Sequence, residues 1–371
     1  NANADGVNQN VTVSTSGDAS GTISSSGTVT VSATANAESD VRYANATASA
    51  AGLTQFVSGG SVFGNAEGNV SHSGILTVDA KADARVPDWS ASGRAEAEGI
   101  DQDVITTSGD ATATITSSSS NFAVTALASA DGQLMATANA NADVINQSVT
   151  VSTSGDASGT ISSSGNVSVD ATADADSSDS DANANASAAG LTQFVSGGSV
   201  SGNADGTISS SGTVNVAATA NADSNSNGAN ATASAAGLTQ VVSSGSFEGN
   251  ASGNVSHSGT LTVDANALAS GDEASGRAEA EGIDQDVTAT SGSATGSITT
   301  TSSNFAVTAL ASAAASQTAT ANANADGINQ FINVSTSGDA SGTISSSGTI
   351  AVDATANADS TDGFANANAN T

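Results

Sequence analysis

A glutamine inside a short apolar box recurs eight times along this chain of 371 residues. The box has the form Gly-Ile/Leu/Val-x-Gln, except that Val144 replaces the glycine in one copy. Its glutamines are Gln9, Gln55, Gln102, Gln147, Gln193, Gln240, Gln285 and Gln330, at intervals of 46, 47, 45, 46, 47, 45 and 45 residues. So constant a period indicates one supersecondary unit copied end to end, with each copy burying its apolar face against its neighbours. The sequence therefore predicts a single repeat array over residues 1–371, of about eight units of 45–47 residues.

Within a unit, small or branched apolar residues alternate with polar ones. Runs such as Ser-Val-Thr-Val-Ser and Asn-Val-Ser-Val-Asp-Ala-Thr-Ala, in the copy at 136–175, have the two-residue period of a β-strand, and helix signals are missing. Ser-Gly and Ser-Ser-Gly between the runs supply glycines for turns. We expect an all-β fold, an elongated repetitive β-solenoid of the parallel β-helix type, with an antiparallel β-meander array as the alternative. The period leaves open whether a unit is one coil of about 45 residues or two coils of about 22.

The alternation changes phase once in each unit. Val29, Val31 and the alanines at 33–37 share one parity, whereas the alanines at 44–50 have the other parity and lead to Leu53. A bend or bulge near Gly52 is needed to bring both sets inward. Alanine-lined faces would let two sheets pack closely. The repeated glutamines are expected to form an interior or edge ladder, hydrogen-bonded from copy to copy, and outward Asn, Thr and Ser are expected to stack likewise.

Composition limits both the core and the partners. Hydrophobic residues make up 37% of the chain, but aromatics only 3%, so the interior must be thin and filled by small side chains. Low hydrophobicity with a net charge of −31 also occurs in disordered chains, but the regular alternation argues against disorder. Five basic residues cannot neutralise a phosphate backbone, so no nucleic-acid partner is expected. No apolar run approaches the roughly 20 residues that span a bilayer, so no membrane insertion is expected.

The two histidines, His72 and His257, lie in the same Val-Ser-His-Ser-Gly context of equivalent units. Catalysis by a Ser-His pair requires a third orienting group and an oxyanion site brought together. Matched positions in equivalent units favour inherited corner residues instead. The sequence therefore predicts no catalytic residues and no enzyme.

Paired carboxylates offer the enzymatic alternative. Glu96 and Glu98 alternate with alanine, so both project from one face of a strand, as the carboxylates of glycosidases face one substrate. Arg94 has the same parity and is expected to relieve their repulsion. The segment returns as Arg277, Glu279 and Glu281. A solvated charged stripe is the preferred interpretation.

Calcium is the cofactor that the acidic residues leave open. The glutamate pairs, and Asp176, Asp179 and Asp181 in another segment, offer the carboxylate oxygens that Ca²⁺ prefers. Neither segment matches an EF-hand loop or the nonapeptide calcium repeat. We therefore expect no cofactor, with calcium binding as the alternative.

Unit types differ most around Tyr43 and Trp89, which occur once each, the second close to Pro87. A variable solvent loop is the default interpretation of such insertions, although they are also where a ligand surface would be expected. Ten Asn-x-Ser/Thr sequons offer acceptors for N-glycosylation. They begin at Asn10, Asn45, Asn69, Asn146, Asn166, Asn185, Asn230, Asn250, Asn254 and Asn333.

The ends of the array nearly continue its period. Gln330 is followed by 41 residues and the count from Asn1 to Gln9 is 9, so a second copy joined to the tail would place its first glutamine about 50 residues on. This predicts head-to-tail stacking of copies through a heterologous contact that generates filaments. That the chain is a segment of a larger repetitive protein is the alternative.

The pattern Gly-x-Val-x-Val-x-Ala-x-Ala, with Ser-Gly and Asp-Ala-Ser-Gly corners, resembles the β-helical repeats of secreted bacterial adhesins of the filamentous-haemagglutinin type over most of the chain. The regular Gln and Asn are also similar to those of curli-like functional amyloids, although the second half of each unit lacks a matching Gln. Both resemblances imply an extracellular fibre or surface adhesin without catalysis. The absence of cysteine and the acidic, lysine-poor composition are common among secreted surface proteins.

We therefore expect a structural subunit of an extracellular filament, sheath or matrix, which assembles end to end with other copies by β-stacking. The first alternative is the stalk of a cell-surface adhesin, with the cell surface or extracellular glycans as partners. The second is a polysaccharide-active β-helical enzyme that uses the glutamate pairs.

Overall fold

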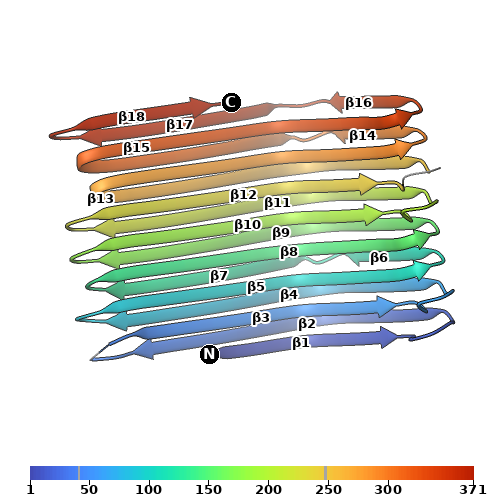
Figure 1. Ribbon diagram of the computed structural model, residues 1–371, viewed down its shortest axis with the longest axis horizontal. Helices are drawn as coiled ribbons and strands as arrows, with labels where there is room; N and C mark the ends of the chain where they lie inside the picture. The colour runs from blue at the N-terminus through green and yellow to red at the C-terminus, as the bar shows by residue number, and fades with distance from the viewer. Residues whose placement is uncertain (41, 246–248) are drawn as a thin grey trace.

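The computed structural model describes residues 1–40, 42–245 and 249–371, and the regular secondary structure of these residues is all β. The strands are β1 (Ala2–Thr12), β2 (Ala19–Glu38), β3 (Ala44–Ser58), β4 (Ala66–Val86), β5 (Ser90–Ser108), β6 (Ala111–Ser117), β7 (Asn121–Gly132), β8 (Met135–Ser154), β9 (Ala157–Ser177), β10 (Asp181–Ser196), β11 (Ala204–Ser224), β12 (Gly228–Ser243), β13 (Ala251–Ser291), β14 (Ala294–Thr300), β15 (Asn304–Ser337), β16 (Ala340–Ser346), β17 (Ile350–Ser360) and β18 (Phe364–Asn370). They belong to one continuous sheet that winds as a solenoid (Figure 1).

All pairings between these strands are parallel, which confirms the β-solenoid and excludes the antiparallel meander for the described residues. Gln9 lies in register with Gln55, and Gln55 with Gln102, so one sequence repeat is one turn of the chain. This decides between one large coil and two small ones. With a strand spacing of about 4.8 Å, eight such coils stack to a height of about 40 Å. Because each coil is so wide, the long axis of the molecule runs along the strands rather than along the stack (Figure 1).

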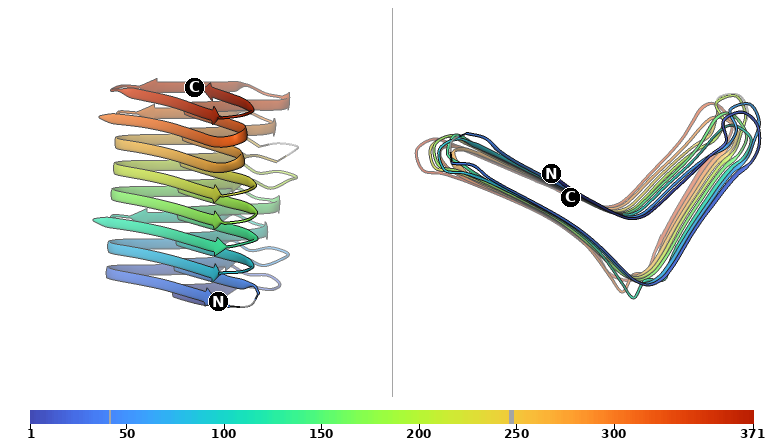
Figure 2. Two further views of the ribbon diagram at one scale, coloured as in Figure 1. Left: turned by 90° about the vertical axis from the view of Figure 1, so that its left-hand side faces the viewer. Right: turned by 90° about the horizontal axis from the view of Figure 1, so that it is seen from below.

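Each coil is a flattened loop bent into a V (Figure 2). Inner strands, such as β3, β5 and β8, line the concave side of the V, and outer strands, such as β4 and β9, line the convex side. We call the arm that ends between β2 and β3 the alanine arm, and the arm that ends between β3 and β4 the glutamine arm. The chain turns from one wall to the other at the two arm tips, and each wall bends at an elbow halfway along.

The inner elbow lies at the phase change expected near Gly52. Gly52 and Leu53 are buried in succession, so the inward-facing residues switch parity there. A Cβ at Gly52 would lie only 2.4 Å from the carbonyl oxygen of Gly99 in the next coil, which explains why glycine recurs. Val144 stands at this position in one coil and is fully buried.

The outer elbow depends on glycine in the left-handed region. Gly74 has φ of 126°, and a Cβ there would lie 2.1 Å from the carbonyl oxygen of Gly27. In two coils the position is Ser119 or Ser302 instead, and the outer strand is interrupted there, between β6 and β7 and between β14 and β15. The hydroxyl of Ser119 then donates to the carbonyl oxygen of Gly74 at 2.8 Å. Ser-Ser-Gly thus marks a bend within a wall; the outer strand continues through it at Gly27 but ends there between β16 and β17.

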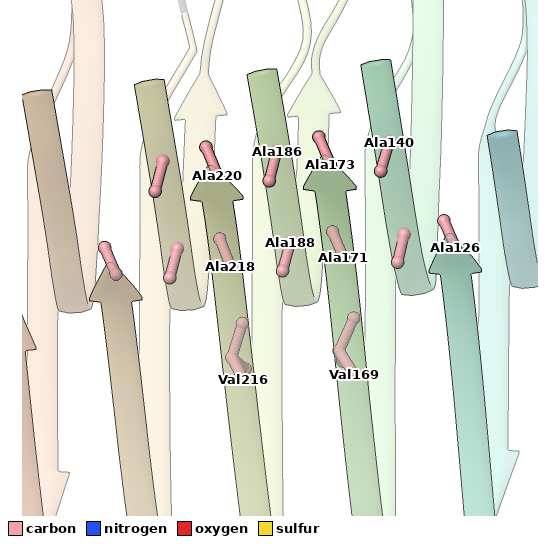
Figure 3. Close-up of a cluster of buried hydrophobic side chains, with 14 of the residues drawn as sticks. Ala126, Ala140, Val169, Ala171, Ala173, Ala186, Ala188, Val216, Ala218 and Ala220 are labelled. Atoms are coloured by element: carbon pink, nitrogen blue, oxygen red, sulfur yellow. The ribbon is translucent and has the colours of Figure 1, made fainter. Parts of the chain in front are cut away.

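The interior is filled mainly by alanine, as the composition predicts. In the alanine arm, alanines of the inner strands β8 and β10 point toward alanines of the outer strands β9 and β11 (Figure 3). Side chains such as Ala171 and Ala184 are completely buried. A second, smaller apolar cluster lies toward the tip of the glutamine arm and includes Val57 and Val104. The row of glutamines separates the two clusters.

Candidate functional site

The eight repeated glutamines lie in one row through the glutamine arm. From the second coil on, the Nε2 of each donates to the Oε1 of its counterpart in the preceding coil, at 2.7–2.9 Å. The six from Gln55 to Gln285 are at most 1% exposed. Each amide therefore satisfies its polar atoms along the stack, which a buried amide needs if its burial is not to destabilise the fold.

The second hydrogen of each glutamine amide bonds across the arm. Every Nε2 also donates to a backbone carbonyl of the outer wall, at 3.1–3.4 Å. The wall residue facing the amide is usually glycine: at Gly68, a Cβ would lie 2.6 Å from Cγ2 of Val104 and 2.8 Å from Oε1 of Gln55. The glycine of Asp-Ala-Ser-Gly, expected at a corner, thus lies within a strand and makes room for the ladder. The row is a structural ladder, because both donor hydrogens are used within the protein.

A second ladder at the tip of the glutamine arm was not anticipated from the sequence. Side-chain oxygens of Asp or Asn accept the backbone N–H of the equivalent residue in the next coil, at 2.8–3.0 Å. The acceptors are Asp18, Asn65, Asp110, Asp156, Asn203 and Asn250. The sequence signal was the Asp or Asn directly before the first alanine of the outer wall in every coil except the one with Ser293. Asn ladders also form among side chains that point away from the interior. For example, Nδ2 of Asn185 on β10 donates to Oδ1 of Asn139 on β8 at 3.0 Å.

The two histidines lie inside the outer elbow and are 1% exposed. In the stack their places are otherwise taken by serine or threonine: His72 lies between Ser25 and Ser117. No side-chain partner among the described residues reaches their ring nitrogens. Burial lowers the pKa of His72, and lowers that of His257 to about 4; interaction of each ring with backbone, at Ile75 and Thr260 respectively, raises the pKa and offsets this only in part. Both rings are thus neutral at pH 7, and neither has the orienting carboxylate of a catalytic triad.

The glutamate pairs lie on the concave face, next to the inner elbow. The Nε of Arg94 donates to Oε1 of Glu96 at 2.9 Å, and Arg277 does the same to Glu279 at 3.0 Å. The arginines therefore relieve part of the repulsion, as expected. Each ion pair is largely exposed and adds little stability.

Further carboxylates join Glu98 at this elbow, and the sequence reasoning missed them. Asp143 of the next coil lies in register with Glu98, and Asp101 and Asp103 follow on the same strand. We call these four residues the elbow carboxylates. A second group, Glu281, Asp284, Asp286 and Asp326, occupies the equivalent places later in the stack. The available signals were the Asp-Gln-Asp triplet and the 45-residue interval, which places one coil over the next.

Burial, together with the charges of neighbouring carboxylates in most cases, raises the pKa values of the elbow carboxylates. Burial raises the pKa of Asp101 to about 6, with further increases from the charges of Asp103 and Glu98, while a hydrogen bond from Asn146 lowers it. Burial, with the charges of Asp101 and Glu96, also raises the pKa of Asp143 to about 6. An aspartate in an unfolded chain titrates near 3.9. The folded protein therefore binds these protons more tightly than the unfolded chain, and the resulting stability is lost as the pH rises through about 6.

We therefore expect Asp101→Asn with Asp143→Asn to raise the midpoint of chemical unfolding at pH 8. The gain should shrink as the pH falls below about 6, because the parent's own carboxyls then become protonated. Denaturant titrations from pH 8 to pH 5 measure this difference. The control, Asp40→Asn with Asp362→Asn, removes the same two charges from exposed tips. An equal gain from the elbow variant at pH 8 and pH 5 would contradict the proposed titration.

The three aspartates considered for calcium are not brought together. Asp179 accepts a hydrogen bond from Nε2 of Gln133 at 2.6 Å, and Asp181 accepts one from the backbone of Gly228 at 3.2 Å. Asp176 lies near the end of the outer strand β9, where burial and the charges of its neighbours raise its pKa. Among the described residues, no group of three or more acidic or histidine side chains could hold a metal ion.

Tyr43 and Trp89 do come together, at adjacent tips of the alanine arm. Their ring centroids lie 6.2 Å apart with the planes tilted by 60°. The sequence placed both in variable loops and did not predict that they would touch.

The chain matches no protein-family model, no curated protein and no solved structure. The resemblance to β-helical adhesins and curli-like proteins therefore stays a prediction. None of the described residues forms a helix long and apolar enough to cross a membrane.

Proposed function

We propose that this chain is a structural building block of an extracellular filament, sheath or matrix, in which copies stack coil on coil. The supporting observation is that the glutamine row and the Asp and Asn ladder run from coil to coil along the stack. A further coil of the same shape would extend both ladders. A parallel solenoid also has complementary end edges, because each coil already fits the one before it. Unpaired strand edges readily pair with other chains.

The last coil shows what such stacking would cover. Ile350 is 41% exposed, whereas Phe305, which lies in register with it one coil earlier, is fully buried. Ile344 is 50% exposed above the fully buried Ile298. A further coil in register would bury both isoleucines, and burial of such a side chain contributes about 1.5–3 kcal/mol.

The glutamine row would continue across the same contact. Among the described residues, Gln9 donates only to the wall carbonyl of Thr22 and to no glutamine. At the other end, Gln330 donates to Gln285, and no later glutamine donates to its Oε1. Placing Gln9 of one copy over Gln330 of another would therefore add one more bond to the ladder.

The charge of the surface would regulate this assembly. A net charge of −31 makes copies repel, which keeps them dispersed at low ionic strength. Salt screens the repulsion, over a Debye length of about 8 Å at physiological ionic strength. We therefore expect assembly to increase with ionic strength, in an extracellular setting where other copies are the main partner.

Ile350→Glu is expected to weaken self-association by roughly a hundredfold, because stacking would bury an unpaired carboxylate. Sedimentation velocity at high ionic strength, over a range of protein concentrations, measures the effect.

Leu268→Glu is the matched control. It adds the same charge to a 39% exposed leucine on the flank of β13 and should leave association unchanged. If the parent stays monomeric at every concentration and salt level, the filament proposal is wrong, and a passive adhesin stalk becomes the better account.

A further inference from the structure

The only tyrosine and the only tryptophan of the chain lie side by side on one edge of the solenoid. Tyr43 directly precedes β3 and Trp89 directly precedes β5, so stacking of successive coils places their tips next to each other. The two residues are 69% and 40% exposed, and their ring centroids lie 6.2 Å apart. In a chain with 3% aromatic residues, this pairing creates a local aromatic surface.

The next coil enlarges this surface. Leu134 and Met135 are 41% and 45% exposed, and the backbone N–H of Leu134 donates to the carbonyl oxygen of Trp89 at 3.1 Å. Met135 is also the only methionine of the chain. We call Tyr43, Trp89, Leu134 and Met135 the aromatic tip.

The coils that follow directly do not keep large apolar side chains at this place, although Phe364 occupies the place of Met135 in the last coil. The place of Met135 is taken by Asp181 in the next coil, and further along the stack by Gly228 and Glu273. The fold therefore does not require large apolar side chains at this position. Contiguous exposed apolar side chains that the fold does not need are typical of a binding surface.

A polar floor extends from the aromatic tip toward the inner elbow. The outward side chains of the first exposed row are Asn45, Ser92 and Thr137, in register on β3, β5 and β8. The next row is Thr47, Arg94 and Asn139. From Tyr43 to Ala51, at the elbow, eight residues of extended strand span about 26 Å. The concave face thus offers a rigid row of hydroxyl and amide groups that begins next to the aromatic tip.

We propose that the aromatic tip and this polar floor bind a neutral polysaccharide chain. A sugar ring has apolar C–H faces, which pack on aromatic rings, and a rim of hydroxyls, which bond to amide and hydroxyl side chains. Tyr and Trp provide such amphipathic contact area with little loss of conformational entropy. An anionic polysaccharide is disfavoured, because the net charge of −31 repels polyanions and Arg94 is already paired with Glu96.

Affinity electrophoresis tests this inference directly. The chain would be run through gels that contain neutral polysaccharides, namely a soluble cellulose derivative, a β-1,3-glucan, a mannan, a xylan and a soluble chitin derivative. At least one should retard the parent, and oligosaccharides of the same type should shift the emission of Trp89, the only tryptophan. Trp89→Ala and Tyr43→Ala should each weaken retardation by about tenfold or more.

Two variants separate ring contact from general effects. Tyr43→Phe keeps the ring and should retain most of the binding. Phe364→Ala is the matched control, because Phe364 is 83% exposed at the same place in the last coil, far from Trp89. It should bind like the parent.

Either of two results would overturn the inference. One is that no polysaccharide in the panel retards the parent or changes the emission of Trp89; a hydrophobic dye that binds the aromatic tip in that case would indicate an apolar protein partner instead. The other is that Trp89→Ala binds as well as the parent. Because the aromatic tip lies on a flank, these readouts do not depend on whether copies stack into filaments.

Discussion

Replacing Gln193 with leucine is expected to lower the free energy of unfolding by about 3 kcal/mol or more. Gln193 is fully buried, its Nε2 donates to Gln147 at 2.8 Å, and its Oε1 accepts from Gln240 at 2.8 Å. Leucine would leave a buried acceptor on one side and a buried donor on the other, each at a cost of about 1–3 kcal/mol. Chemical denaturation, together with hydrogen exchange of β10, measures the loss.

Gln133→Leu is the control for this change. Gln133 donates to Asp179 at an exposed tip, so the same substitution should alter the free energy of unfolding by no more than about 0.5 kcal/mol. In a solenoid, stability is carried by contacts between neighbouring coils, so exchange should accelerate first in the coils on either side of Gln193. A Gln193→Leu protein as stable as the parent would show that the glutamine ladder is dispensable.

Gly212→Ala is expected to destabilise the outer elbow by about 3 kcal/mol or more. Gly212 has φ of 115°, which alanine adopts only with strain. Its Cβ would also lie 2.2 Å from the carbonyl oxygen of Gly165, a backbone atom that neighbouring coils hold in place. The midpoint of chemical unfolding measures the combined effect.

Gly27→Ala separates the two causes. Gly27 has φ of 105° at the equivalent elbow of the first coil, but a Cβ there would meet no atom within 4 Å. It should therefore show only the backbone strain, about 1–2 kcal/mol. Equal losses at Gly27 and Gly212 would mean that close coil stacking is not what requires glycine at this elbow.

The parts of the fold that the sequence predicted are those with a one-dimensional signal. The glutamine interval gave the number of units, the two-residue alternation gave the strands, and the change of parity gave the bend at Gly52. Each follows from the chain alone, because a strand alternates its side chains between two faces whatever lies beside it. The alanine interior follows from composition in the same way.

The features that sequence reasoning missed depend on which residues lie in register between coils. Asp143 is 45 residues from Glu98, and Trp89 is 46 from Tyr43, so neither neighbour can be identified until one repeat is known to be one coil. The same uncertainty hid the Asp and Asn ladder at the tip of the glutamine arm. Ser-Ser-Gly was assigned to turns because a glycine with positive φ occurs both at a bend within a wall and at a turn that ends a strand. The residue types are the same in the two cases.

The central claim, that this chain is a stacking unit, is tested most directly by electron microscopy of residues 1–371 at low and high ionic strength. We expect isolated monomers at low salt and, at high salt, filaments one monomer wide, with a layer line near 4.8 Å and an axial repeat of about 38 Å, the height of eight coils. Single monomers in every condition, or irregular aggregates without that axial repeat, would contradict the proposal that this chain is a stacking unit.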